Sequence, residues 1–125
     1  MYLLSRLTEL GLDVREDILH KLVYRMREKG VKIELYFMKV DSEGLIFSHE
    51  LSRRLERLAK LGYIKRFLIV SHSYEELYKP VYKISDKGLS ILKRIGISQR
   101  DKKIIDEIVR EIKTKLERAK VKRGV

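Results

Sequence analysis

The chain has 125 residues, of which 29 are basic and 18 acidic, and it contains neither cysteine nor tryptophan. This length predicts one domain, and a hydrophobic fraction of 44% is enough for a core. The lack of cysteine excludes disulfides, thiolate metal sites and cysteine nucleophiles. No apolar run is long enough to cross a membrane and no secretory signal is visible, so we expect a cytoplasmic protein. The sequence has no Asn or Cys and a single Gln, beside many Lys, Arg and Glu, and this composition favours a thermophilic source.

The positive charge is concentrated in two parts of the chain. Residues 1–47 balance eight basic with eight acidic residues, and residues 67–92 balance three with three. Residues 48–66 have six basic against two acidic residues, and residues 93–125 have twelve against five. Clustered positive charge favours an anionic partner, which could be nucleic acid, an anionic membrane surface or an acidic protein.

The first third of the chain predicts two helices and a strand. A leucine stripe marks a short helix over residues 2–10. Asp13 is a candidate N-cap for a second helix that ends at Gly30, and the helical period places His20 on its polar side. Apolar and polar residues then alternate over residues 31–40, which predicts a strand.

The middle of the chain predicts a helix followed by a hairpin. Ser48 is a good N-cap for a helix over residues 48–61, whose leucines recur at helical spacing. Residues 63–71 and 81–84 are rich in β-branched and aromatic side chains and predict two strands joined by a long polar loop.

The last third predicts two more helices. Ser85 begins a short one and Ser98 a long one. The chain is therefore divided into a domain over residues 1–97, a C-terminal helix over residues 98–119 and a basic, mobile tail over residues 120–125.

Two stretches of the sequence resemble a known superfamily. Residues 51–64 read LSRRLERLAKLGYI, a leucine-patterned helix that ends in Leu-Gly-aromatic-Ile before a strand, and residues 82–88 read YKISDKG, a strand leading into a capped helix. Together they resemble the winged helix-turn-helix superfamily, in its archaeal or thermophilic regulator-like form. The resemblance implies an α+β, mostly α fold with a long C-terminal helix, a recognition helix over residues 48–61 and a wing over residues 63–84.

One feature departs from that superfamily. The standard motif joins its two helices by a turn of about 3–4 residues, whereas residues 30–47 intervene here. Either residues 42–47 contain a short helix or a strand is inserted. The arrangement also resembles, more distantly, the Panacea-type antitoxin domain. A protein-interaction module of the antitoxin or adaptor kind, which keeps the fold without reading bases, is therefore the alternative to a DNA-binding transcriptional regulator.

The residues expected to contact double-stranded DNA lie on the outer side of the recognition helix and on the hairpin. Arg53 and Arg57 are one turn apart, and arginine can pair bidentately with guanine or with phosphate. Glu56 on the same side of the helix would repel phosphate, but it could accept a hydrogen bond from a cytosine amino group. The alternative is that these residues only form a solvent-exposed helix face and bind no DNA. The full expected set is Ser48, His49, Ser52, Arg53, Arg57, Lys60, Lys65, Arg66, Lys79 and Lys83.

The last helix has an apolar stripe that could cover its own domain or a second copy of the chain. We expect a homodimer, because a small domain has little surface to cover so wide a stripe. The expected dimerisation residues are Ile104, Ile105, Ile108, Val109, Ile112 and Leu116. A twofold dimer would place two recognition helices roughly 34 Å apart. Membrane binding is not expected, because this helix has no Trp or Phe.

No catalytic or cofactor pattern is present in the sequence. The three histidines are scattered without metal-ligand spacing, and no glycine loop of the phosphate-binding kind occurs. We therefore expect neither an enzyme nor a bound metal or cofactor, and no motif indicates a small-molecule effector.

Overall fold

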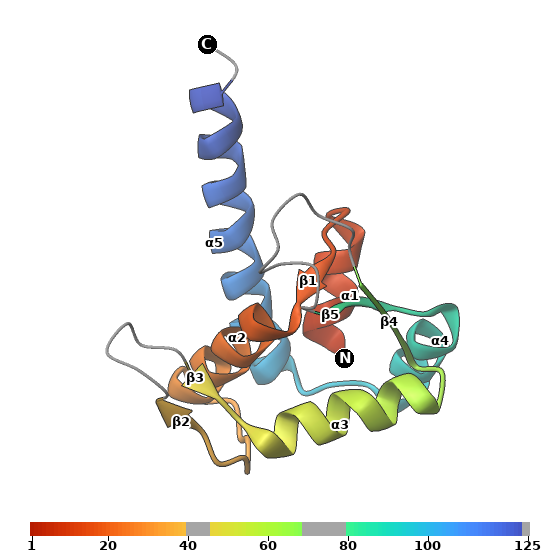
Figure 1. Ribbon diagram of the computed structural model, residues 1–125. Coiled ribbons are helices and arrows are strands. Elements are labelled where there is room, and N and C mark those ends of the chain that lie inside the picture. Colours follow the sequence, from red (N-terminus) through yellow and green to blue (C-terminus); the bar gives the residue numbers. More distant parts are fainter. Residues whose placement is uncertain (40–45, 69–79, 124–125) are drawn as a thin grey trace.

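The computed structural model describes residues 1–39, 46–68 and 80–123, with side chains as far as residue 118. This part of the chain is α+β, and most of its regular structure is helical (Figure 1). The elements follow the chain as α1 (Tyr2–Glu9), β1 (Val14–Arg15), α2 (Glu16–Glu28), β2 (Met38–Lys39), β3 (Ile46–Phe47), α3 (His49–Lys60), β4 (Ile64–Leu68), β5 (Pro80–Ile84), α4 (Asp86–Ile95) and α5 (Gln99–Arg123).

A three-stranded antiparallel sheet has the order β1-β5-β4. The hairpin of β4 and β5 was expected, but β1 was not, and the predicted N-cap at Asp13 is wrong. Val14 pairs with Tyr82, and α2 begins after Arg15, whose backbone is extended and whose side chain makes no capping hydrogen bond. Two residues are too few to show a period, so only the pairing with β5 reveals this strand.

The strand predicted over residues 31–40 is wrong for most of its length. Residues 31–37 have no regular structure, and only Met38–Lys39 pair, with Ile46–Phe47. The alternation is nevertheless real, because Val31 and Leu35 are buried and the residues between them are more exposed. An extended segment that lies on the core shows the same period as a strand, whether or not a neighbour completes its ladder.

Two short strands lie between α2 and α3. β2 and β3 form a small antiparallel pair, so a strand insertion separates the two helices. Residues 40–45 lie outside the described residues, and with them most of the stretch where a short helix was considered.

The predicted caps of α3 and α4 are confirmed. The side-chain oxygen of Ser48 accepts from the backbone N–H of Leu51, and that of Ser85 accepts from Gly88. These bonds satisfy helix-end N–H groups that have no partner within the helix.

The hydrophobic core lies between α1, α2, α3, the sheet and the first half of α5. Ile105, Ile108 and Val109 are buried in this core, so they pack on their own domain and are closed to a partner. The second half of α5 extends away from the body of the molecule (Figure 1), and Leu116 there is 38% exposed. The helix also continues through Arg123, beyond the end predicted at residue 119.

A close approach of α4 to the start of β4 requires glycine. A Cβ atom at Gly88 would lie 2.1 Å from the backbone oxygen of Tyr63 and 2.8 Å from a side-chain carbon of Ile84. We expect Gly88→Ala to lower the free energy of unfolding by about 1–3 kcal/mol, the usual result of overpacking a core contact. Urea unfolding followed by circular dichroism measures this.

Ser90→Ala is the matched control, because Ser90 is exposed on the same helix. It should leave stability almost unchanged or raise it slightly, since alanine favours helix. Equal stability of the Gly88 variant and the parent would contradict the packing of α4 on Tyr63.

Candidate nucleic-acid interface

Helix α3 separates an apolar inner face from a basic outer face. Leu51 and Leu55 are buried against the core. At about 100° per residue, Arg53, Arg57 and Lys60 project from the opposite side, and all three are exposed. The sequence prediction of a basic outer face is confirmed.

The cations of this outer face have no neutralising partner in the part of the chain that the structure describes. Within the described residues, Arg53, Arg57 and Lys60 form no ion pair or side-chain hydrogen bond. The contrast with α2 is clear, because Arg25 and Lys29 both pair with Glu111 of α5. Unpaired guanidinium groups on a rigid helix are available to bind phosphate or a base edge.

The N-terminus of α3 is held by a buried histidine. His20 of α2 is only 1% exposed, its Nδ1 accepts from the backbone N–H of Ser48 at 3.0 Å, and its Nε2 lies 3.3 Å from the Ser52 hydroxyl. Its ring stacks on Phe47 at 4.7 Å. The prediction placed His20 on the polar side of α2, but the ring is buried, because it meets the backbone of another element there.

This contact changes the role of two residues that were expected to bind DNA. Ser48 is 1% exposed and caps α3, so it is closed to a nucleic acid. Ser52 is half-buried beside His20. His49 is exposed at the start of α3 and packs edge-on to Phe47, which leaves it on the accessible surface.

The hairpin adds positive charge next to the C-terminal end of α3. Lys65 of β4 and Lys83 of β5 are directly opposite each other in the ladder, and both are exposed. Like charges in this position repel, so an anion that binds between them would relieve the repulsion. Lys79 lies outside the described residues.

Arg66 is tied to the sheet. Its Nε donates to the Tyr82 hydroxyl at 3.2 Å, and Tyr82 is fully buried. Burial raises the pKa of the Tyr82 phenol above its usual value, and the hydrogen bond from Arg66 offsets part of that rise. Arg66 is exposed as well, so its remaining N–H groups are accessible.

The charge of α5 does not extend the basic face of α3. In Figure 1, α3 lies along the bottom of the molecule and the second half of α5 extends from the top. A straight duplex that lies on α3 does not reach the end of α5 in the same subunit.

Other kinds of site receive no support from the described residues. No group of three or more His, Asp or Glu side chains there could hold a metal ion. Among the same residues no helix is both long and apolar enough to cross a membrane. Comparison of the chain with protein-family models, curated proteins and solved structures finds no match.

The contact between His20 and Ser48 predicts a pH dependence of stability. Burial lowers the pKa of His20 from 6.5, and the carboxylates of Glu16 and Asp17 offset part of this shift. A lowered folded-state pKa means that the unfolded chain binds more protons at mildly acid pH. The stability that this contact contributes is therefore complete above pH 6.5 and is lost as the pH falls from 6.5 through the folded-state value.

We expect the urea midpoint of the parent to decrease when the pH is lowered from about 7.5 to about 5.5. His20→Gln should remove much of that decrease. His49→Gln is the control, because the exposed His49 ring has no buried donor to lose. If the His49 variant flattens the profile and the His20 variant does not, the assignment of the titrating group is wrong.

Proposed function

We propose that the protein binds double-stranded DNA as a winged helix-turn-helix transcriptional regulator, with α3 as recognition helix and β4–β5 as wing. The observation that carries this proposal is the row of exposed cations on the outer face of α3, which are unpaired within the described residues and lie beside the exposed Lys65 and Lys83 of the hairpin. A single turn at Leu61 and Gly62 joins the helix to the hairpin, so the two surfaces are contiguous.

The arrangement of the elements supports the same proposal. A recognition helix needs a rigid attachment and one open face that fits the major groove. His20 attaches the start of α3, and the turn into β4 attaches its end through a bond from the Tyr63 N–H to the Leu58 carbonyl. The β2–β3 insertion lengthens the connection from α2 but leaves this outer face uncovered within the described residues.

In this mechanism, α3 and the hairpin supply different terms of the binding free energy. Arg53 and Arg57 can pair bidentately with guanine in the major groove. Lys65 and Lys83 neutralise phosphates and supply affinity that is independent of sequence. Glu56, exposed on the same side of α3, repels phosphate and so favours a docking in which it meets a cytosine amino group.

The double variant Arg53→Ala, Arg57→Ala tests this proposal. We expect a loss of duplex affinity of about 1–3 kcal/mol for each arginine that pairs with a base, and a salt slope lower by about one for each lost phosphate contact. Fluorescence anisotropy of labelled duplex, titrated at several salt concentrations, measures both quantities.

The matched control is Lys21→Ala, Lys103→Ala, which removes two exposed cations from α2 and α5 and gives the same net charge. Its affinity should stay near that of the parent. Equal losses of affinity in the two double variants would show that binding depends on net charge and not on the outer face of α3. Parent protein that binds no duplex at low salt would favour the protein-interaction module instead.

We further propose that the regulator acts as a homodimer through the outer half of α5. Ile105, Ile108 and Val109 are used by the protein's own core. Of the other expected residues, Ile104 and Ile112 are half-buried and Leu116 is exposed, so the contact centres on Leu116. Leu116 is an exposed leucine on a helix that extends from the body, and pairing with a second copy would remove it from water (Figure 1).

Leu116→Lys should convert a dimeric parent into a monomer, because a charge in an apolar helix contact is costly to bury. Thr114→Lys is the control, since Thr114 is exposed on the same stretch of α5 and should tolerate lysine. Sedimentation velocity separates the two states. A parent that sediments as a monomer, or a dimer unaffected by the Leu116 change, excludes this interface.

A further inference from the structure

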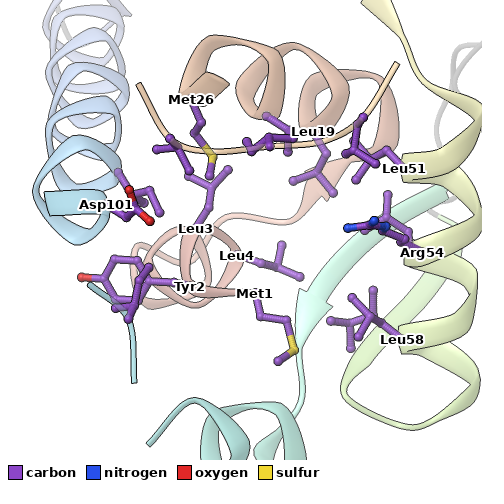
Figure 2. Close-up of a pocket in the computed structure, with 18 residues that line it drawn as sticks. Met1, Tyr2, Leu3, Leu4, Leu19, Met26, Leu51, Arg54, Leu58 and Asp101 are labelled. Atoms are coloured by element: carbon purple, nitrogen blue, oxygen red, sulfur yellow. The ribbon is translucent and has the colours of Figure 1, made fainter. Parts of the chain in front are cut away.

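A cavity of about 340 Å³ opens into the core between α1, α2, α3 and the start of α5. Figure 2 shows side chains from all four helices around it. Leucine and methionine make up much of its wall, including Leu3, Leu4, Met26, Leu51 and Leu58. This size lies within the range of small-molecule sites.

The wall of the cavity selects an apolar occupant. Among the leucine and methionine side chains, an ordered water would lack the two or more polar partners that it needs. Left empty, the cavity would deprive its lining atoms of dispersion contacts. A hydrocarbon group that fills it would restore those contacts.

One cationic side chain points into this cavity. Arg54 follows Arg53 in sequence, but the 100° step between neighbours brings its side chain to the edge of the leucine face. Figure 2 shows its guanidinium group projecting from α3 toward Leu4. Within the described residues Arg54 forms no ion pair or hydrogen bond, and it is exposed, so its donors are free to pair with a ligand.

An acidic side chain lies on the opposite wall. Asp101 in the first turn of α5 also lines the cavity, across from Arg54 in Figure 2. An anionic head group is therefore attracted to the Arg54 side and repelled from the Asp101 side. These two side-chain charges favour an orientation in which the anionic head group lies at Arg54.

We propose that this cavity binds a small amphipathic carboxylate, with its hydrocarbon part among the leucines and its carboxylate paired with Arg54. Arginine can hold a carboxylate through two parallel N–H···O bonds. This site is separate from the DNA-binding face, which uses the opposite side of α3, and its test needs no DNA.

The test uses octanoate as the probe, with 1-octanol as its uncharged counterpart. Methyl NMR spectra of the full chain, labelled at leucine, are recorded during each titration. We expect octanoate to shift the methyl signals of Leu3, Leu4 and Leu58, which line the cavity, and to leave those of Leu116 unchanged. Octanol should bind at the same methyls at least about tenfold more weakly, because it lacks the charged pair.

Variants of adjacent arginines separate the site from general attraction. Arg54→Gln should weaken octanoate at least about tenfold and leave octanol unchanged, whereas Arg53→Gln should alter neither. Leu58→Trp, which places a large side chain in the cavity, should abolish binding of both probes. The proposal is overturned if octanoate shifts no cavity methyls, if the Arg53 and Arg54 variants lose octanoate equally, or if a folded Leu58→Trp protein binds as the parent does.

Discussion

The buried imidazole of His20 determines where α3 begins and how it is oriented. Its Nδ1 accepts from the N–H of Ser48, the same residue whose hydroxyl caps the helix, so one short segment joins α2 to α3. Because Nδ1 must accept, the ring is neutral and Nε2 carries the hydrogen, which points toward the Ser52 oxygen. Protonation of Nδ1 would place two donors face to face in a buried site, and the outer face of α3 would lose its fixed direction.

The C-terminal end of α3 is held by hydrogen bonds from α4 and from its N-cap residue. Lys87 donates to the carbonyl of Leu61 at 2.7 Å, and the Ser85 hydroxyl donates to that of Gly62. Gly88 allows α4 to approach closely enough for both bonds to form. A helix fixed at its two ends can keep one face in the core and present the other to a ligand without moving, which is what precise recognition of a groove requires.

The sequence was a good guide where local chemistry decides the structure. Serine caps, leucine spacing and the apolar hairpin strands are local signals, and they located α3, α4 and the hairpin. The role of His20 could not be predicted, because its partner is the backbone of a residue 28 positions away. The same holds for β1, whose two residues become a strand only because β5 lies beside them.

Counts of charged residues along the chain do not give the charge of each surface, because ion pairs join residues that are distant in sequence. The first 47 residues are neutral in sum, yet Arg25 and Lys29 neutralise Glu111, and Arg6 pairs with Asp106, so their cations offset the acids of α5. The remaining cations of α5 are thus less compensated than a count of its own residues indicates. Positive charge alone therefore marks two surfaces, at opposite ends of the molecule. Within the described residues, the surface of α3 combines that charge with a rigid helix and an adjoining hairpin, and the proposed DNA binding rests on this combination.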